Sequence, residues 1–355
     1  MIRIGIIGAG MIAGAHCDKA KETGNCKITA VCDIDKQKAE DLAAKYGLKV
    51  HNNHKELCAD KDVDAILIAV PPAIRVGIFT DALTFNKPIL LEKPLCVNEN
   101  DLAVYEKSSN NNPNILIMDA ACRHTRLQAK FPVVKKIIQE GKLGDIYYIN
   151  HMAIHREARL GIEWNPNAKW ALDKSMALAG PLADWGVYDL TFHLGLLPYD
   201  VDLLSSDTFM ITGLDKVDTG GAVFDVEEHF ISTLQFSHNI RYQYERASKM
   251  HNAPCDETRI FGTKGGIKLQ YLSWDSPQIE YFYTDDDGKG EIRAEIVEGS
   301  IKNYLSDEAE LLKHFSNCAM KKETPILPFK QSIKYMKMIF AILKQAKEMN
   351  IRPQN

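Results

Sequence analysis

The first third of the chain alternates short apolar runs with amphipathic stretches. Five runs are apolar at successive positions, so we expect strands that are buried on both faces. These runs are Ile2–Ile7, Ile28–Cys32, Ala65–Val70, Pro88–Leu91 and Ile115–Met118. Between them, apolar residues recur at helical spacing, for example over Asp35–Tyr46. Strands and helices that alternate in this way predict a parallel sheet with right-handed crossovers.

The pattern changes after about residue 120. Helical spacing over Phe131–Gln139 ends at Gly141, and strand patterns then dominate. We expect strands at Asp145–His155, Glu227–Phe236, Ile240–Ala247, Thr258–Phe261, Ile267–Leu272 and Ile279–Tyr283. Several of them alternate apolar with polar residues, which predicts an antiparallel sheet with one covered and one wetter face. Two helices, near Leu305–Met320 and Ser332–Met349, are expected to close the chain.

Composition narrows the classes of function. The 355 residues are enough for about two domains, and the net charge of -4 gives no basic excess for binding nucleic acid. No apolar run nears the ~20 residues that span a bilayer. The eight cysteines include no Cys-x-x-Cys pair, and the chain opens on a strand pattern rather than on a signal peptide. We therefore expect a cytoplasmic protein with reduced thiols and with no metal, nucleic-acid or membrane partner.

A glycine turn directly follows the first expected strand. Gly8-Ala9-Gly10-Met11-Ile12-Ala13 has the form G-x-G-x-x-A, whose glycines let a pyrophosphate approach the N-terminus of the next helix. Asp33 comes directly after the second expected strand and 20 residues after Ala13, where a carboxylate can bind the hydroxyls of a ribose. The alternative is a glycine turn that only closes a βαβ unit. Because Asp33 would repel the 2′-phosphate of NADP, NAD is the expected cofactor, with NADP kept open by Lys36 and Lys38.

Two further segments carry candidate chemistry. Lys93, in Glu92-Lys93-Pro94, follows a buried strand, and ligands of open parallel sheets bind at the carboxyl ends of the strands. Pro181 suits the first turn of a helix, and a helix that starts there places Asp184 and Tyr188 at i and i+4 on one face. The alternatives are that Lys93 is an ordinary surface lysine, that Asp184 is a first-turn carboxylate favoured by the helix dipole, and that Tyr188 is an aromatic residue of the core.

Taken together, these segments resemble the Gfo/Idh/MocA family of oxidoreductases over nearly the whole chain. The resemblance rests on Gly8-Ala9-Gly10, Ala69-Val70-Pro71-Pro72, Glu92-Lys93-Pro94, Gly141-Lys142-Leu143-Gly144, Asp184-x-Gly186-x-Tyr188 and Gly262-Thr263-Lys264-Gly265-Gly266. It implies an N-terminal Rossmann domain with a doubly wound parallel sheet, over residues 1–121. It also implies a C-terminal α/β domain with an open, mostly antiparallel sheet, over residues 122–355, for substrate binding and oligomerisation. The implied activity is oxidoreduction of sugars, cyclitols and related polyols with NAD or NADP.

The motifs and the resemblance together assign site residues. The expected cofactor-binding residues are Gly8, Gly10, Met11, Ile12, Asp33, Ile34, Ala69, Val70, Pro71, Glu92 and Lys93. The expected catalytic residues are Lys93, Tyr188 and Asp184, which also contact the substrate. Further substrate contacts are expected from Arg126, at a position that often faces the substrate in the family, and from Arg156, Trp164 and Trp170 in the loops before Asp184. Tryptophans that only pack the loops, and solvated charges, are the alternative.

Three departures from the family pattern stand out. Tyr188 replaces the usual His, as in glucose–fructose oxidoreductases and dihydrodiol dehydrogenases, and favours an aldose or carbonyl substrate. The glycine run before Asp184 is reduced to Ala179-Gly180-Pro181. Pro72 and Arg75 replace the usual Asn and His, a change that can alter cofactor contacts or substrate fit.

The expected chemistry is hydride transfer between the nicotinamide and a carbinol or carbonyl carbon, with Tyr188 moving the proton. A phenol ordinarily has a pKa of ~10, about three units above neutrality, which corresponds to ~4 kcal/mol. A Lys ammonium ~4 Å away, at an effective dielectric constant of ~20, supplies roughly that energy. Lys93 is therefore a sufficient partner for Tyr188, and Asp184 would hold a sugar hydroxyl or the ammonium. The opposite assignment, with Lys93 as the acid/base and Tyr188 as the orienting group, stays open.

Two other functions stay open as well. One is a glycosidase that uses bound NAD for transient oxidation, as some members of the family do. The other is a non-catalytic sensor that binds a nucleotide, against which the presence of both Lys93 and Tyr188 argues. Tyr and Ile alternate with polar residues in the later strands, from which we expect an apolar sheet face and a homodimer or homotetramer.

Overall fold

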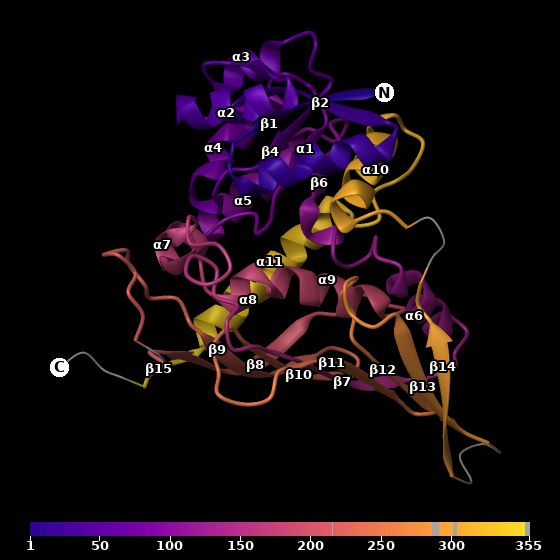
Figure 1. Ribbon diagram of the computed structural model, residues 1–355. Helices are drawn as coiled ribbons and strands as arrows, with labels where there is room; N and C mark the ends of the chain where they lie inside the picture. Colours follow the sequence, from indigo (N-terminus) through magenta and orange to yellow (C-terminus); the bar gives the residue numbers. More distant parts are fainter. Residues whose placement is uncertain (215, 286–290, 301–303, 352–355) are drawn as a thin grey trace. The chain divides into compact units, whose positions relative to one another are not determined.

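The computed structural model describes residues 1–214, 216–285, 291–300 and 304–351. The chain forms two compact units (Figure 1). The first comprises residues 1–127 and 303–336, and the second comprises residues 128–302 and 337–355. The expected domains are continuous and meet between residues 121 and 122, whereas the first compact unit also takes in a C-terminal segment. The functional division at that point stays a prediction.

The first unit is built on a six-stranded parallel sheet. Its strands are β1 (Ile2–Ile7), β2 (Cys26–Cys32), β3 (Lys49–Val50), β4 (Ala65–Ile68), β5 (Ile89–Leu91) and β6 (Ile117–Asp119), in the order β3-β2-β1-β4-β5-β6. All five predicted apolar runs form strands, and each adjacent pair is parallel. This order is that of a doubly wound dinucleotide-binding fold, so the predicted fold of the N-terminal part is confirmed.

Helices connect these strands. They are α1 (Met11–Thr23), α2 (Lys36–Tyr46), α3 (His54–Ala59), α4 (Pro72–Leu83) and α5 (Glu99–Asn111), with a 3₁₀ turn η1 (Ala120–Cys122) after β6. Of these helices, α2, α3 and α5 each begin at a side chain that caps the helix. Asp35 accepts a hydrogen bond from the Lys38 backbone nitrogen at 3.3 Å, and Asn98 accepts one from that of Asp101 at 2.8 Å. Each cap satisfies a backbone donor that has no partner inside its helix.

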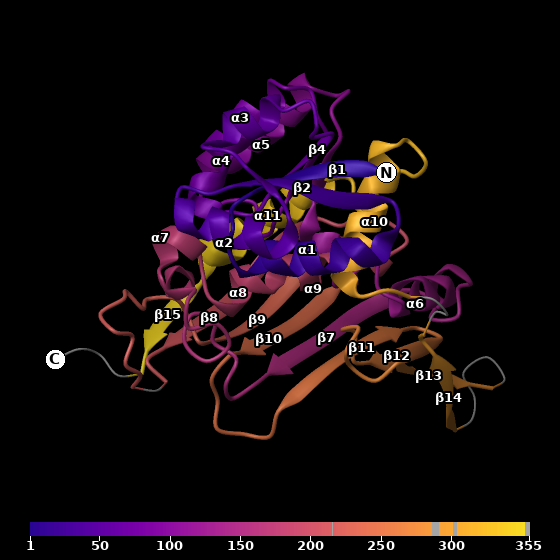
Figure 2. The same cartoon turned by 45° about the horizontal axis from the view of Figure 1, so that its top comes forward.

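A helix from the end of the chain completes the first unit. In Figure 2, α10 (Asp307–Ala319) lies beside α1. Leu311, Leu312 and Phe315 of α10 are fully buried. The Asn25 amide nitrogen donates to the Lys313 carbonyl and to the Asn317 side chain, both at 2.9 Å. Because of this packing, the first unit is not continuous in sequence.

The second unit is built on a nine-stranded sheet, in the order β14-β13-β12-β11-β7-β10-β9-β8-β15. The strands are β7 (Ile146–Ile154), β8 (Leu203–Thr212), β9 (His229–Phe236), β10 (Arg241–Ala247), β11 (Cys255–Gly262), β12 (Gly265–Leu269), β13 (Gln278–Thr284), β14 (Ile292–Glu298) and β15 (Lys347–Asn350). Among the described strands of this sheet, only the β7–β10 and β8–β15 pairs are parallel. The prediction of a mostly antiparallel sheet is therefore confirmed.

The second unit also contains several helical elements, most of which are short. The elements are α6 (Lys130–Gln139), η2 (Lys169–Leu172), α7 (Lys174–Ala177), α8 (Pro181–Asp184), α9 (Gly186–Leu196) and the end of α11 (Phe329–Gln345). The helix expected over Ser332–Met349 ends too late, because Lys347–Asn350 instead pairs with β8. Neither β8 nor β14 was expected. The first half of β8 is mostly polar and part-exposed, which hides the strand pattern.

The two faces of this sheet differ. Tyr242 and Tyr244 on β10 are fully buried, and their hydroxyls bond His193 and Asp189 of α9. Figures 1 and 2 show α9 on one face of this sheet. The intervening Arg241, Gln243 and Glu245 are exposed or half-buried. The predicted alternation is thus confirmed, but the tyrosines belong to the covered face. They cannot form the exposed apolar face from which the homo-oligomer was expected, and the homo-oligomer itself stays a prediction.

Within the described part of the chain, no helix combines the length and the apolar character that crossing a membrane requires.

Removal of the Phe315 side chain should destabilise the first unit. We expect Phe315→Ala to lower the free energy of unfolding by about 3–5 kcal/mol, because the ring is fully buried. The exposed Lys322, just beyond α10, provides a control, and Lys322→Ala should change it by less than ~0.5 kcal/mol. Chemical denaturation measures both. A loss below ~1 kcal/mol for Phe315→Ala would show that α10 is dispensable to this unit.

Candidate active site

The glycine turn between β1 and α1 leaves room for a ligand. Gly8 has φ +102°, and a Cβ there would lie 2.6 Å from the Ala69 carbonyl oxygen, so only glycine fits. Gly10 is the N-cap of α1, and a Cβ there would meet no atom within 4 Å. Gly10 and Met11 are exposed. The start of α1 is therefore an open helix N-terminus that fits the pyrophosphate of a dinucleotide.

Asp33 is tied to that glycine turn. Its carboxylate accepts a hydrogen bond from the Ala9 backbone nitrogen at 2.7 Å through one oxygen and from that of Asp35 at 2.8 Å through the other. The side chain is half-buried, whereas Ile34 beside it is fully exposed. Because each carboxylate oxygen has a second lone pair, Asp33 can still accept hydrogen bonds from the two hydroxyls of a ribose.

Arg75 braces the turns that follow β4 and β5. The side chain is only 2% exposed. Its guanidinium donates to the Val70 carbonyl at 3.1 and 2.6 Å, and also to the carbonyls of Glu92 and Pro94. One side chain thus links the turn over Ala69–Pro71 to the turn that holds Lys93. The sequence showed Arg75 only as a departure from the family pattern.

Glu92 is buried and faces other protein side chains. Its Oε1 atom lies 2.8 Å from the Arg123 guanidinium and 2.7 Å from Nε2 of His16 on α1, and its Oε2 accepts from the Lys93 backbone nitrogen at 3.2 Å. Burial acts to raise the pKa of Glu92, but Arg123 and His16 outweigh it and hold that pKa well below its usual range. These contacts join α1 to the half-buried Lys93. They favour a structural role for Glu92, and its cofactor contact stays a prediction.

Asp184 and Tyr188 lie in the second unit on either side of a helix break. A helix does start at Pro181, but the expectation that it continues through Tyr188 is wrong, because α8 ends at Asp184, Trp185 is the N-cap of α9, and α9 starts at Gly186. Gly180 and Leu182 donate backbone hydrogen bonds to the buried Glu227 carboxylate at 2.7 and 2.9 Å, which fixes the start of α8.

The two side chains also differ in exposure. Asp184 is half-buried and Tyr188 is 1% exposed. The Tyr188 ring lies against that of Trp185, with centroids 5.5 Å apart. Since the helix is broken between Asp184 and Tyr188, their i, i+4 spacing does not place them on one helix face.

The predicted substrate residues have different surroundings. Arg126, in the first unit, is buried and donates to the Ile326 carbonyl, the Gln331 side chain and the Tyr335 hydroxyl at 2.7–3.0 Å. These contacts favour a structural role. In the second unit, Arg156 is exposed and bonds His251 at 2.7 Å, Trp164 is 65% exposed, and Trp170 is half-buried in η2. Their contacts with substrate stay predictions.

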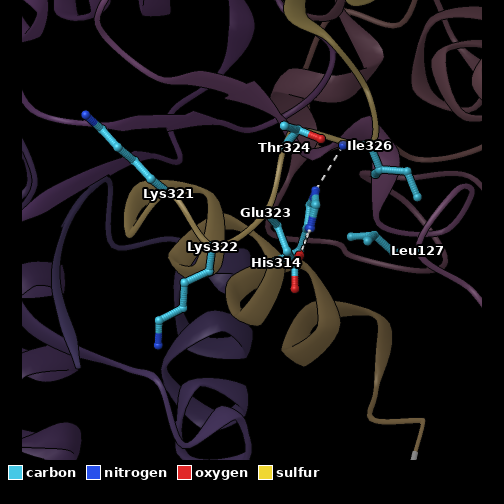
Figure 3. Close-up of a pocket in the computed structure, with 7 residues that line it drawn as sticks. All are labelled: Leu127, His314, Lys321, Lys322, Glu323, Thr324 and Ile326. Atoms are coloured by element: carbon cyan, nitrogen blue, oxygen red, sulfur yellow. Dashed lines mark hydrogen bonds and ion pairs between the residues drawn. The ribbon is translucent and has the colours of Figure 1, made fainter.

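One group of possible metal ligands lies among the described residues, in the first unit. His314, Cys318 and Glu323 have donor atoms within 4.8 Å of one another. Figure 3 shows the His314 ring between Glu323, 2.6 Å from Nδ1, and the Ile326 backbone nitrogen, which donates to Nε2 at 3.0 Å. Burial raises the pKa of the Cys318 thiol to about 11. Both imidazole nitrogens are therefore hydrogen-bonded within the protein, and these contacts favour a structural link between α10 and the loop that follows it.

The comparisons with known proteins agree with this organisation. Residues 2–118 match the family described as "Oxidoreductase family, NAD-binding Rossmann fold", and residues 131–268 match "GFO/IDH/MocA C-terminal domain". Inositol 2-dehydrogenase from Salmonella paratyphi B is 29% identical over 146 residues, which is 40% of this chain and 43% of that protein. Inositol 2-dehydrogenase from Burkholderia cenocepacia is 35% identical over 99 residues, 27% of this chain and 29% of that protein. The matched region thus spans less than half of these relatives.

Among solved structures, a levoglucosan dehydrogenase in complex with NADH and L-sorbose is similar, with a TM-score of 0.81 at 18% identity. The alignment covers 97% of this chain and 96% of that one. At this identity the likeness shows the fold. Fold and sequence together define a protein with an NAD-binding Rossmann part and a largely antiparallel C-terminal part. The chain belongs to the Gfo/Idh/MocA family of oxidoreductases, which confirms the resemblance.

Loss of the Arg75 brace should weaken cofactor binding. Arg75→Met leaves buried carbonyls without donors in both turns, and we expect the Kd for NADH to rise by about tenfold, or ~1.4 kcal/mol. Arg3→Met is the control, because it makes the same change near the start of β1, at the opposite end of the sheet from the glycine turn. There Arg3 binds Asp62 and Asp64. Fluorescence titration with NADH measures both variants. Equal Kd values for NADH in Arg75→Met and Arg3→Met would refute the role of Arg75 in holding the two turns for the cofactor.

Proposed function

We propose that this protein is an NAD-dependent oxidoreductase that transfers hydride between a nicotinamide and a sugar, cyclitol or related polyol or carbonyl substrate. The observation that carries the proposal is the Asp33 carboxylate bonded to Ala9 within the open glycine turn. Family membership supports redox chemistry. The inositol 2-dehydrogenases and the levoglucosan dehydrogenase named above support a carbinol of a ring-shaped polyol or sugar as the reacting group.

The surroundings of Asp33 support NAD as the cofactor rather than NADP. The 2′-phosphate of NADP would add negative charge beside this carboxylate. The two lysines nearest in sequence are directed to acidic neighbours, since Lys36 lies 3.5 Å from Glu40 and Lys38 lies 3.5 Å from Asp35. Both pairs are exposed and therefore weak, but neither lysine is held in place as a phosphate ligand.

The residues around the glycine turn would hold the cofactor. The open N-terminus of α1 would take its pyrophosphate, Asp33 its ribose, and the backbone of Ala69–Pro71 would border it. When bound, the nicotinamide ring supplies the acceptor or donor of the hydride. Lys93, in the turn held by Arg75 and Glu92, would polarise the substrate oxygen.

Tyr188 and Asp184 would act on the substrate. In this proposal Tyr188 takes the hydroxyl proton of an alcohol as it is oxidised, or returns one to a carbonyl as it is reduced, and Asp184 orients a neighbouring hydroxyl. The reverse assignment, with Lys93 moving the proton, predicts the same requirement for both groups. Contacts from Arg126, Arg156, Trp164 and Trp170, a homodimer or homotetramer, and a cytoplasmic location remain predictions.

A panel of sugars and cyclitols tests the activity. We expect net formation of NADH with at least one polyol or aldose, and kcat/KM at least about tenfold higher with NAD than with NADP, or ~1.4 kcal/mol. NADH fluorescence is the measurement. Release of an aglycone without net NADH formation would favour the redox-assisted glycosidase. Tight binding of NADH with no turnover on the whole panel would favour the sensor.

Substitution of Lys93 and Tyr188 tests the assigned roles. We expect Lys93→Met and Tyr188→Phe each to lower kcat by about 10²–10⁴-fold, with little change in NADH affinity for Tyr188→Phe. If both act in one step, the double variant should be little worse than either single one. A pH–rate profile shows which residue moves the proton, because substitution of that residue removes the limb of the profile that its titration produces. Lys19→Met and Tyr199→Phe serve as controls, and unchanged turnover in both test variants would refute the scheme.

A further inference from the structure

The residue that follows Tyr188 in the chain, Asp189, forms a buried ion pair with Arg246. Asp189 of α9 is fully buried, and Arg246 of β10 is 4% exposed. Nε of Arg246 lies 2.6 Å from Oδ2 of Asp189, and a terminal nitrogen of Arg246 lies 2.9 Å from Oδ1. The pair is therefore bidentate, which fixes orientation as well as distance. No sequence pattern predicts this pair, because the two residues come from a helix and a strand that are 57 residues apart in the chain.

Asp189 also gathers donors from elsewhere on the sheet. The Tyr244 hydroxyl donates to Oδ2 at 2.5 Å, and the Tyr271 hydroxyl donates to Oδ1 at 2.6 Å. His151 Nε2 lies 3.3 Å from Oδ1. Burial acts to raise the pKa of Asp189, but Arg246 and His151 outweigh it and hold that pKa well below its usual range. The carboxylate is thus ionised, and its lone pairs are occupied.

The remaining polar groups of this cluster form a chain that ends at Asp189. Consecutive links join Tyr242 to His193 Nδ1 at 2.8 Å, His193 Nε2 to Thr258 at 3.0 Å, and Thr258 to His151 Nδ1 at 2.9 Å. These three links can all be satisfied by donation in one direction, from the Tyr242 hydroxyl toward His151. Burial lowers the pKa of His193 well below its usual value, in agreement with this direction.

Arg246 contacts two neighbours of Tyr188, which are Asp189 next to it in the chain and Trp185 against its ring. The Arg246 guanidinium lies 4.6 Å from the centre of the Trp185 ring, and that ring in turn lies against Tyr188. The backbone nitrogens of Tyr188 and Asp189 both donate to the Trp185 carbonyl, at 2.9 and 3.0 Å. Successive residues of an α-helix are rotated by about 100°, so the anchor at Asp189 also sets the direction of its neighbour Tyr188.

We propose that Arg246 is a positioning residue for Tyr188, which it orients through Asp189 on one side and Trp185 on the other. The inference rests on the proposed function, in which Tyr188 moves a proton. A buried ion pair contributes little net stability compared with apolar residues of similar size. Its effect here is to fix the rotation of α9 and the position of the Trp185 ring at the break between α8 and α9.

The test compares two tyrosines that are matched in burial and strand. Tyr244→Phe removes a donor to Asp189, whereas Tyr242→Phe removes a donor to His193 at the far end of the chain. Arg246→Met alone would leave a buried unpaired carboxylate and can prevent folding, so the main variant is the double substitution Asp189→Asn with Arg246→Met. Arg246→Lys keeps the charge but loses the bidentate geometry.

We expect the double variant to lower kcat by about 10–100-fold, as small displacements of a reacting group do, while the Kd for NADH changes by less than about twofold. Arg246→Lys and Tyr244→Phe should show smaller losses in the same direction, and Tyr242→Phe should leave kcat unchanged. The ¹³Cζ resonance of Tyr188, assigned by its absence in Tyr188→Phe, should shift or broaden in the double variant and not in Tyr242→Phe.

A folded double variant with wild-type kcat and an unchanged Tyr188 resonance would overturn the proposal. So would losses of equal size in Tyr244→Phe and Tyr242→Phe, which would indicate a general effect of the core. Absence of wild-type turnover on every substrate would instead contradict the proposed function. The resonance of Tyr188 would then still decide whether Arg246 orients it.

Discussion

Arginine keeps its proton inside a folded protein, so a buried guanidinium must be surrounded by acceptors. Arg75 meets this requirement with backbone carbonyls, which belong to the turns after β4 and β5. Arg246 meets it with the carboxylate of Asp189. In both cases the charge fixes the geometry of a segment that carries candidate site residues. The guanidinium groups thus position the site without being exposed to its ligands.

The choice of acceptor has a different consequence in each unit. Neutral carbonyls around Arg75 add no negative charge to the turn that carries Lys93, and Glu92 is paired with His16 and Arg123. Arg75 thus holds the turn that carries Lys93 through backbone carbonyls, and no carboxylate is needed as its partner. In the second unit the charges of Arg246 and Asp189 balance, while burial raises the pKa values of Tyr242, Tyr244 and Tyr271 and lowers that of His193. The bidentate pair therefore fixes the orientation of α9 with no net charge of its own.

The strands of the Rossmann part could be predicted from sequence, because residues buried on both faces give continuous apolar runs and the glycine turn follows them directly. Caps such as Asp35 are equally local. The break at Trp185 could not be predicted, since the groups that contact its two sides, Glu227 at the start of α8 and Arg246 over the Trp185 ring, are distant in sequence. The β8–β15 pairing depends on long-range contacts in the same way. Local patterns encode periodicity, whereas partners of buried polar groups are set by the tertiary register.

The tyrosine at position 188 makes orientation more important than a histidine would. An imidazole has an ordinary pKa of ~6.5 and can exchange a proton near neutrality unaided, whereas a phenol at ~10 depends on a nearby cation. The benefit of a cation falls with distance, so the hydroxyl must be held in a narrow range of positions. In the second unit, Trp185 and the Asp189–Arg246 pair restrict the ring. Under the proposed function, Lys93 then has to supply only the charge, because the geometry of Tyr188 is already fixed by its own unit.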